Sequence, residues 1–582
     1  MSKMEKVGVV GAGTMGSGIA QKLAQEGLSV VLVDLDDAKV AAGLGRVRAT
    51  LDEAVARKIF DRAKADAVLG RIEGTADFGR LAAADVVIEA VFEDLGVKRD
   101  VFARLDAACR PDAVLATNTS SFRVAQVAEA TKRPGRVLGL HFFYHPAKNR
   151  LVEVVPHAGT DRGALERAWT LQERTGKLPI ASKDAPGFVV NRYFVPWLNE
   201  AARLLDEGVA NVATIDAAAK AAFGIGMGPF ELMNVTGLPI ALHSAETLGR
   251  ELGSFYSPSP RLAAQVKTGK PWDLAGEVEG AKMDAVRDRL LGAVLLVAGE
   301  LHDEAVASPE DADLGARVGL RWRAGPFELA HELGGKRAHE LAKAAAAPHG
   351  RRLSKLAGEA WAAGDTVAPR RVRLEFAPDG LATITLARPD AMNALDEATV
   401  AELEARWKEA EARDDVRGVL IRGQGKAFVA GADVKWFVKQ LDAEKAGQPG
   451  IERIIAFTKQ GQELLASFAR SKKVVIAALE GLSLGGGSEL ALACDYAIAT
   501  ARGSIGFPET GIGIYPGLGG TQRLPRRVGR GLARWMVYTG RSLDAEDAVA
   551  AGALDALVEP EELRAKALEL TARGKPAWSG AP

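Results

Sequence analysis

The sequence predicts an α/β protein built from several domains, and three features of the chain lead to this class. Short apolar runs alternate with helical stretches in the first part of the chain, which is typical of parallel βαβ units. A long helical region follows and contains an internal repeat. Strand signals then return after a short linker and continue among glycine-rich turns. A length of 582 residues leaves room for roughly three to five domains.

Residues 1–184 form the first predicted domain, a mostly parallel sheet with helices between its strands. Its apolar runs predict buried strands at residues 5–10, 29–34, 85–89 and 113–117. The order of strand, turn, helix and strand along this region is the one found in Rossmann-type domains.

A glycine pattern, G-x-G-x-x-G, joins the first strand to the first helix at Gly11, Gly13 and Gly16. Such glycines permit a tight turn and let the backbone approach a pyrophosphate at the helix N-terminus. A structural glycine turn would explain the glycines alone, but not the strand, the helix and Asp34 together. A carboxylate at Asp34 accepts hydrogen bonds from ribose hydroxyls and repels a 2′-phosphate. The pattern therefore predicts binding of NAD rather than NADP.

The helical region is predicted to be duplicated. The pentapeptide GPFEL occurs twice, and in the same register DEGVA is repeated as DEAVA and Asp216 as Asp313. Three matches in one register indicate a duplicated all-α domain, with a first copy at residues 185–270 and a second at 271–361. The second copy is expected to pack on the first and to contribute no catalytic residues of its own.

A stretch rich in Ala, Gly, Pro and Arg at residues 362–371 is the predicted linker, and residues 372–582 form the last predicted domain. Its first strands are expected at residues 372–376, 381–386 and 416–421.

Composition excludes several classes of protein. Seventy-five Lys and Arg residues balance 75 Asp and Glu residues, so neither a nucleic-acid partner nor a polybasic membrane patch is indicated. Two cysteines, Cys109 and Cys494, are too few for a disulfide framework or a cysteine-rich metal site, and no metal is expected. No apolar run reaches the ~20 residues of a spanning helix. We therefore expect a cytoplasmic protein without a membrane span.

The chain up to about residue 330 resembles the 3-hydroxyacyl-CoA dehydrogenase family. The resemblance is carried, in the family's order, by the motifs IEAVFEDLGVKRDVF, TNTSSF, GLHFF, LVEVV, KDAPGFVVNR and MGPFEL. It implies oxidation of a 3-hydroxyacyl-CoA with NAD. By the same resemblance, Glu93, Lys98 and Asn118 are expected to bind the cofactor, with Lys98 near the substrate as well.

The expected base of this reaction is His141, because an imidazole ordinarily titrates near neutral pH and can accept the hydroxyl proton. Glu153 would hold the ring in the required tautomer, as in a triad. The resemblance implies that Ser120 and Asn191 bind the reacting oxygen. Where the family commonly has Asn-Pro after His-Phe-Phe, this chain has Tyr-His-Pro, so the loop beside the base should differ and His145 is a rival base.

From residue 372 onward the chain resembles the crotonase (enoyl-CoA hydratase/isomerase) superfamily, which implies a crotonase-fold ββα domain. The resemblance is carried by ITLARPDAMNAL, KAFVAGADVKWF, GLSLGGGSELALACDYAIA and FPETGIGIYPGLGGTQRL. It assigns the backbone N–H groups of Ala432 and Gly486 to the oxygen of a thioester enolate. Glu489 and Glu509 would divide the proton transfers, one activating water and the other acting at the α carbon.

The combined interpretation is a β-oxidation enzyme that hydrates a trans-2-enoyl-CoA and oxidises the (3S)-3-hydroxyacyl-CoA. Two alternatives stay open for the last domain: isomerisation of the double bond, or acyl-CoA binding without catalysis. Ordinary crotonases continue for several helices beyond the point at which this chain ends, so we expect another part of the fusion to supply their cover, or the usual trimer not to form. Acyl-CoA is the expected substrate, and a thiolase or a second copy of the chain stays open as a further partner.

Overall fold

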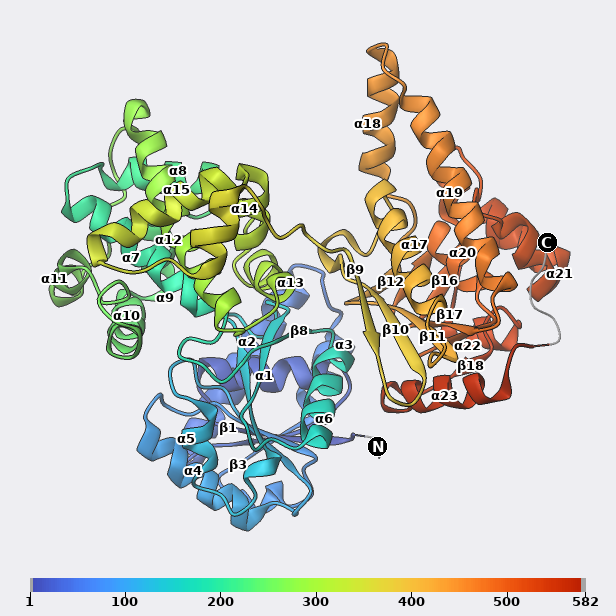
Figure 1. Ribbon diagram of the computed structural model, residues 1–582. Coiled ribbons are helices and arrows are strands. Elements are labelled where there is room, and N and C mark those ends of the chain that lie inside the picture. The colour runs from blue at the N-terminus through green and yellow to red at the C-terminus, as the bar shows by residue number, and fades with distance from the viewer. Residues whose placement is uncertain (1–3, 577–582) are drawn as a thin grey trace. The chain divides into compact units, whose positions relative to one another are not determined.

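The computed structural model describes residues 4–576, and the chain forms two compact units (Figure 1). One unit holds Met4–Pro369 and the other begins at Arg370. The division falls inside residues 362–371, the stretch predicted as a linker, while the domain limits themselves stay a prediction. Each unit is described by itself below.

The first unit contains an eight-stranded sheet in the order β3-β2-β1-β4-β5-β6-β7-β8. Its strands are β1 (Lys6–Val10), β2 (Ser29–Val33), β3 (Ile72–Thr75), β4 (Val86–Glu89), β5 (Val114–Thr117), β6 (Val137–Phe142), β7 (Leu151–Pro156) and β8 (Leu178–Ala181). All neighbours are parallel except β6 and β7, which pair antiparallel. The strand order reverses at β1, so the carboxyl ends of β1 and β4 form the switch point where such sheets bind ligands. The α/β prediction is confirmed.

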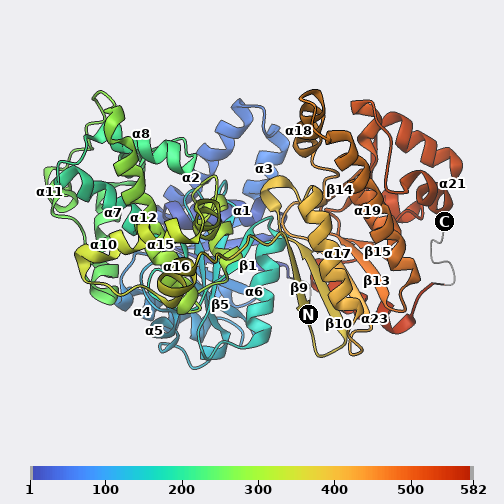
Figure 2. The same cartoon turned by 45° about the horizontal axis from the view of Figure 1, so that its top comes forward.

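Helices cover both faces of this sheet (Figures 1 and 2). One face carries α1 (Thr14–Gln25), α2 (Asp37–Ala56), α3 (Arg62–Gly70) and α6 (Arg162–Arg174), and the other carries α4 (Leu95–Ala108) and α5 (Val124–Ala128). Because strand residues alternate in direction, Val30 and Leu32 of β2 join the first core, and Val31 and Val33 join the second. Burial on both faces explains why β2 is a continuous apolar run.

The rest of the first unit is helical, as predicted. The first copy of the repeat comprises α7 (Val190–Asp206), α8 (Val212–Phe223), α9 (Pro229–Thr236), α10 (Leu238–Leu252) and α11 (Pro260–Thr268). The second comprises α12 (Met283–Asp303), α13 (Pro309–Leu314), α14 (Pro326–Leu333) and α15 (Gly335–Ala346), with the short α16 (Trp361–Ala363) after it. Helix α12 packs against α7, α8 and α15, so the two copies share one apolar core.

The repeated aspartates make the same contact in both copies. Asp216 accepts hydrogen bonds from the N–H groups of Phe230 (2.9 Å) and Glu231 (3.1 Å) at the start of α9. Asp313 accepts them from Phe327 (2.8 Å) and Glu328 (3.4 Å) at the start of α14. Each GPFEL motif therefore begins a helix whose first N–H groups are satisfied by the preceding helix, which accounts for the register of the repeat.

The second unit contains a six-stranded sheet in the order β18-β15-β13-β11-β10-β9 and a four-stranded sheet in the order β12-β14-β16-β17. The strands are β9 (Val372–Phe376), β10 (Leu381–Leu386), β11 (Gly418–Gly423), β12 (Ala427–Val429), β13 (Val474–Leu479), β14 (Leu482–Leu484), β15 (Tyr496–Ala499), β16 (Ser504–Gly506), β17 (Ser542–Asp544) and β18 (Ala556–Leu557). The strand expected at residues 416–421 begins two residues later, because Val416 closes a turn by donating its N–H to Arg413 O.

Helices cover both faces of the six-stranded sheet, with α17 (Glu397–Glu411) and α19 (Gly450–Arg470) on one face and α23 (Leu563–Arg573) on the other. In β11, Val419 and Ile421 join the first core and Leu420 the second. The remaining helices are α18 (Val434–Lys445), α20 (Gly486–Ala493), α21 (Gly520–Thr539) and α22 (Ala545–Ala550). Helix α20 contacts β12, β13 and β14 and therefore lies beside both sheets.

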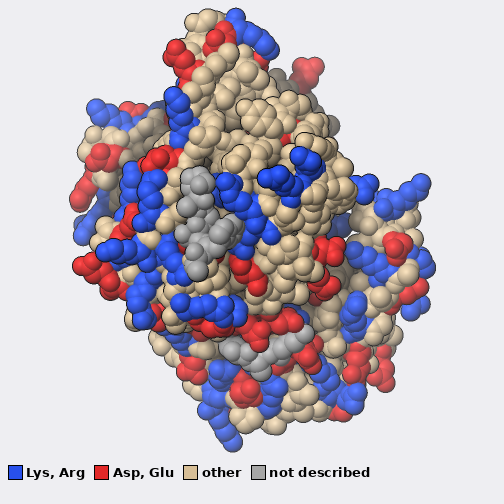
Figure 3. All heavy atoms as spheres, turned by 90° about the vertical axis from the view of Figure 1, so that its right-hand side faces the viewer, with Lys and Arg blue, Asp and Glu red and all other residues tan. Residues whose placement is uncertain are grey.

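Charge is spread over the surface. On the face shown in Figure 3, Lys and Arg side chains are interspersed with Asp and Glu, in keeping with the zero net charge of the chain. Among residues 4–576, no helix is both long enough and apolar enough to cross a membrane.

The repeated contact predicts equal stability effects in the two copies. Asp313→Ala and Asp216→Ala each leave two N–H groups at a helix start without their acceptor, which we expect to cost about 1–3 kcal/mol of unfolding free energy. Urea unfolding measures this loss. The exposed Asp206→Ala is the matched control and should change stability by less than about 0.5 kcal/mol. An unchanged urea midpoint for Asp313→Ala would show that this contact does not stabilise the second copy.

Candidate active sites

The glycine turn after β1 has the geometry of a phosphate site. Gly11 has a φ of +100°, and a Cβ there would lie 2.5 Å from the carbonyl oxygen of Ala90. A Cβ on Gly13 would meet nothing within 4 Å, so this residue faces open space. Gly13 is also the N-cap of α1 and supplies no side chain to its first turn. The free N–H groups there fit the pyrophosphate of a dinucleotide.

Asp34 directly follows β2 and lies beside this turn. One carboxylate oxygen accepts a hydrogen bond from the N–H of Ala12 (2.6 Å) and the other from the N–H of Leu35 (2.7 Å). The side chain is only half-buried, so each oxygen keeps a lone pair that a ribose hydroxyl can reach. The contact with Ala12 fixes the carboxylate against the glycine turn, where the predicted ribose contact requires it.

Lys98 lies in a buried ion-pair cluster. Its Nζ is 2.8 Å from Glu89 Oε1 and 3.1 Å from Glu93 Oε2, and the side chain is 1% exposed. Burial lowers the pKa of Lys98, but the charges of Glu89 and Glu93 outweigh burial and leave the pKa raised. Glu89 was missed by the sequence analysis, although an acid that ends a buried apolar strand was a usable signal.

Glu93 shapes the loop that carries Ser120. Its Oε1 accepts hydrogen bonds from Thr119 Oγ1 (2.6 Å) and from the N–H groups of Ser120 and Ser121 (both 3.0 Å). Among the described residues, the Ser120 hydroxyl has one hydrogen-bond partner, the Ser121 hydroxyl at 3.3 Å, and it stays available to a ligand. In the same loop, Asn118 accepts a hydrogen bond from the N–H of Phe142 (2.8 Å), which ties the loop to the strand that carries His141.

His141 and Glu153 face each other across the antiparallel pair β6 and β7, where they are register partners. His141 Nδ1 lies 2.5 Å from Glu153 Oε2. The other carboxylate oxygen, Oε1, accepts hydrogen bonds from the N–H groups of Val189 (3.1 Å) and Val190 (2.8 Å) at the start of α7. The ring of Phe143 packs on the imidazole, with 4.6 Å between the two ring centroids. Since Nδ1 is used, Nε2 is the nitrogen free for a substrate.

Asn191 follows Val190 in α7 and is half-buried, so it lies at the helix start that holds Glu153. The rival base, His145, is placed differently. Its Nδ1 accepts the N–H of Ala147 (3.2 Å), and no described carboxylate pairs with it. Burial lowers the pKa of His145, and the charge of Lys148 adds to this effect. The geometry therefore favours His141 over His145.

In the second unit, Ala432 and Gly486 lie close together. A Cβ on Gly486 would be 3.9 Å from the backbone nitrogen of Ala432. Within residues 4–576, neither backbone N–H donates a hydrogen bond to another group. Two free N–H groups on neighbouring segments are the arrangement that an oxyanion requires.

Glu489 lies in the first turn of α20 and is 1% exposed. Its Oε1 accepts hydrogen bonds from the N–H groups of Leu518 and Gly520, both at 2.7 Å. Burial raises the pKa of Glu489, while these two hydrogen bonds favour the charged form and oppose the rise.

Glu509 lacks the pair of backbone donors that Glu489 has in Leu518 and Gly520. It lies in the short 3-10 helix Pro508–Ile512, and its buried Oε2 has no hydrogen-bond partner among the described residues. Burial, with the charge of Glu489 as a smaller cause, raises the pKa of Glu509 to about 7. A Cβ on Gly485 would lie 3.0 Å from Glu509 Oε1, so this carboxyl borders the segment that contains Gly486. The four residues predicted for the second site therefore lie together.

Three family descriptions match the chain. Residues 6–185 match "3-hydroxyacyl-CoA dehydrogenase, NAD binding domain", and residues 377–575 match "Enoyl-CoA hydratase/isomerase". "3-hydroxyacyl-CoA dehydrogenase, C-terminal domain" matches twice, at residues 187–277 and 286–365.

Individual relatives agree with these matches. The chain is 36% identical over 263 residues to a 3-hydroxybutyryl-CoA dehydrogenase of Clostridioides difficile, covering 45% of this chain and 94% of that protein. It is 31% identical over 395 residues to a fatty acid oxidation complex subunit alpha of Vibrio vulnificus, covering 62% of this chain and 56% of that protein. A crystal structure of an Escherichia coli 3-hydroxybutyryl-CoA dehydrogenase superposes with a TM-score of 0.58 at 25% identity, covering 62% of this chain and 99% of that one.

Proposed function

Because the chain belongs to the 3-hydroxyacyl-CoA dehydrogenase family and carries an enoyl-CoA hydratase/isomerase domain, we propose that it hydrates a 2-enoyl-CoA at one site and oxidises the 3-hydroxyacyl-CoA product at the other. The chain is thus a bifunctional enzyme of fatty-acid β-oxidation type, and NAD is its cofactor. One observation supports the residue assignments: the groups predicted for each site, whether side chains or backbone N–H groups, lie within the same unit.

At the dehydrogenase site, His141 Nε2 accepts the proton of the substrate hydroxyl. The glycine turn at Gly11 and Gly13, with Asp34, would hold NAD, which would supply the hydride acceptor for the carbon that bears the hydroxyl. Glu153 holds the imidazole through Nδ1 and stabilises the imidazolium that forms. The N–H groups of Val189 and Val190 fix the far oxygen of Glu153, so the carboxylate cannot rotate away from the ring. The Ser120 hydroxyl and the Asn191 amide bind the reacting oxygen.

At the hydratase site, the N–H groups of Ala432 and Gly486 bind the thioester oxygen, on which negative charge develops as water adds. Glu489 is held as a carboxylate by two N–H groups and removes a proton from the attacking water. The buried Oε2 of Glu509 has no partner among the described residues, and burial raises the pKa of Glu509 to about 7, so its protonated form delivers a proton to the α carbon. The hydroxyl thereby joins the β carbon, and the double bond becomes single.

The arrangement favours hydration over the two alternatives. An isomerase moves one proton between two carbons and needs a single acid–base group, whereas both carboxyls here are buried and near enough that Glu489 affects the pKa of Glu509. Binding without catalysis would not require two unpaired N–H groups beside two buried carboxyls.

Exposed aromatic side chains and buried thiols support two further assignments. Trp535 (41% exposed) and Tyr538 (72% exposed) lie one turn apart on α21, which supports a contact with a second copy of the chain or with a thiolase.

Both cysteines are buried free thiols, which suits a reducing, cytoplasmic location.

The base assignment predicts separable activities. His141→Ala should lower NAD reduction by about 10²–10⁴-fold because the general base is lost, while hydration in the same sample continues. Glu153→Gln should also lower NAD reduction, since the ring loses its charged partner. NADH absorbance with a 3-hydroxyacyl-CoA measures the change. The exposed His243→Ala serves as matched control. A near-normal rate in His141→Ala would rule out His141 as the base.

The acid assignment predicts a pH dependence of hydration. Protonated Glu509 predominates below its pKa of about 7, so kcat/KM for a short 2-enoyl-CoA should fall as pH rises through that value. Glu509→Gln should remove this dependence and lower the rate by about 10²–10⁴-fold. Loss of thioester absorbance over a range of pH values measures both. If Glu509→Gln keeps the same fall in rate with pH, another group is the acid.

A further inference from the structure

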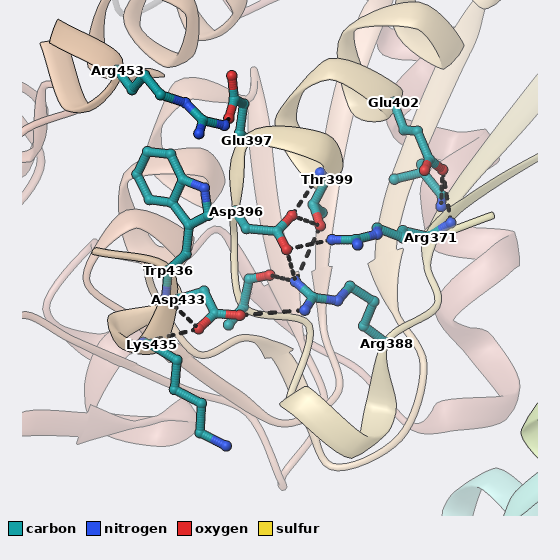
Figure 4. Close-up of polar contacts among 12 residues, drawn as sticks. Arg371, Arg388, Asp396, Glu397, Thr399, Glu402, Asp433, Lys435, Trp436 and Arg453 are labelled. Atoms are coloured by element: carbon teal, nitrogen blue, oxygen red, sulfur yellow. Dashed lines mark hydrogen bonds and ion pairs between the residues drawn. The ribbon is translucent and has the colours of Figure 1, made fainter. Parts of the chain in front are cut away.

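A charged cluster lies beside the proposed enolate site, around the guanidinium of Arg388 (Figure 4). Arg388 follows β10 and directly precedes Pro389. Its Nη1 donates hydrogen bonds to the carbonyl oxygen of Ala394 (2.6 Å) and to Thr399 Oγ1 (3.2 Å), and lies 3.2 Å from Asp396 Oδ2. Its Nη2 lies 3.3 Å from Asp433 Oδ2. The side chain is 18% exposed, so these contacts are largely shielded from solvent.

Both aspartates in the cluster begin helices, and each uses only one oxygen to do so. Asp396 Oδ1 accepts the N–H of Thr399 (2.9 Å) at the start of α17. Asp433 Oδ1 accepts the N–H of Lys435 (3.1 Å) at the start of α18. The second oxygen of each carboxylate faces Arg388 (Figure 4). The helix caps are therefore complete without Arg388, and its two ion pairs serve to join the two helix starts.

The segment next to these ion pairs of Arg388 contains the Ala432 N–H, which is the proposed donor to the enolate oxygen. Leu395 donates its N–H to the carbonyl oxygen of Gly431 (2.9 Å) and accepts the N–H of Asp433 (2.8 Å). Ala432 lies between these two contacts and pairs with Leu395 as an isolated parallel bridge. Arg388 contacts both segments of this β-bridge: it binds Ala394 O on one segment and the Asp433 carboxylate on the other.

We propose that Arg388 is a positioning residue of the hydratase site, which holds the Ala432 N–H in line with the thioester oxygen. This inference rests on the proposed role of Ala432. The direction of that N–H is set by the peptide plane between Gly431 and Ala432. Hydrogen bonds with Leu395 hold both ends of the Gly431–Asp433 segment, and Arg388 also binds the Asp433 end. Arg388 itself does not touch the substrate oxygen.

The contacts explain why arginine fits this position. Four acceptors, namely a carbonyl oxygen, a hydroxyl and two carboxylates, surround the two terminal nitrogens and suit the planar fork of a guanidinium. Burial raises the pKa of Asp396, but hydrogen bonds from Thr399 and the charge of Arg388 outweigh burial and leave the pKa lowered. Asp396 thus remains a charged partner of Arg388 at neutral pH.

Arg371 provides a matched control within the same cluster. It also pairs with Asp396, through Nη1, and is 34% exposed. It has no described contact with Asp433 or with the Gly431–Asp433 segment. Arg371→Gln therefore removes one charge and one ion pair at the same aspartate without releasing the segment that carries Ala432.

The test compares Arg388→Gln with Arg371→Gln in the full chain. Hydration of crotonyl-CoA should lose up to about 100-fold in kcat with little change in KM in Arg388→Gln, because the donor is misplaced. The kcat for hydration should change little in Arg371→Gln. Arg388→Lys should recover part of the rate, since it keeps the charge but not the fork. NAD reduction from a 3-hydroxyacyl-CoA should be the same in all variants.

A spectroscopic measurement separates positioning from general damage to the fold. Acetoacetyl-CoA bound as an enolate absorbs at longer wavelength than its keto form, and the enolate needs the two N–H donors. Titration should give a weaker enolate band for Arg388→Gln than for the unaltered enzyme or Arg371→Gln. The dehydrogenase site also accepts a 3-ketoacyl-CoA but is the same in these proteins, so differences between them report the hydratase site.

Three results would overturn the proposal. Arg388→Gln with unchanged kcat and an unchanged enolate band would show that Arg388 does not position Ala432, while leaving the proposed function intact. Equal losses in Arg388→Gln and Arg371→Gln would show that the cluster acts only through stability. An unaltered enzyme that neither hydrates crotonyl-CoA nor forms the band would overturn the proposed hydratase site, and the role of Arg388 with it.

Should Arg388→Gln fail to fold, Asp433→Asn decides the question. An asparagine keeps a carbonyl oxygen for the cap of α18 and replaces the oxygen that faces Arg388 with an NH₂ group. A fall in kcat and in the enolate band is expected, smaller than for Arg388→Gln because Ala394 is still held. Normal values of both in folded Asp433→Asn would contradict the proposal.

Discussion

The dehydrogenase site depends on one buried carboxylate, Glu153, which is fully shielded from solvent. A charge in such a place is costly unless hydrogen bonds satisfy it. Both oxygens of Glu153 are satisfied, because the imidazole binds one of them and two N–H groups at the start of α7 bind the other. The same contact joins the sheet that carries His141, the proposed base, to the helical region that follows it. The start of α7 therefore contacts His141 through Glu153, and α7 itself packs against α12 of the second copy.

At the hydratase site, two buried carboxyls also need hydrogen-bond partners, and Glu489 has more of them than Glu509. Glu489 Oε1 accepts two backbone hydrogen bonds, whereas the buried Oε2 of Glu509 has no partner among the described residues. This difference suits the proposed roles of Glu489 as a carboxylate and of Glu509 as a neutral acid. In both units the decisive donors are backbone N–H groups that helix starts and glycine-rich turns leave free. Arg388 extends this pattern, because it acts on the direction of a backbone N–H rather than on the substrate.

Much of this arrangement could be predicted from the sequence, and the part that could not has a physical reason. The glycine turn with Asp34, the repeat of Asp216 and Asp313, and the spacing of His141 and Glu153 are local or register patterns of side chains. The N–H groups of Val189 and Val190 belong to residues whose side chains take no part, so no residue type signals them. The buried pairing of Lys98 with Glu89, and of Arg388 with Asp433, requires knowledge of which segments meet in space. The assigned roles themselves stay predictions until tested.

Hydrogen exchange at the start of α7 tests the central claim most directly. In Glu153→Ala, the N–H groups of Val189 and Val190 lose their acceptor. Mass spectrometry of short peptides that span these two residues should show faster deuterium uptake than in the unaltered enzyme, with peptides from α12 unchanged. Oxidation of a 3-hydroxyacyl-CoA should fall in the same sample. Unchanged uptake at Val189 and Val190, together with lost oxidation, would show that Glu153 serves the base without support from α7, and would contradict the account.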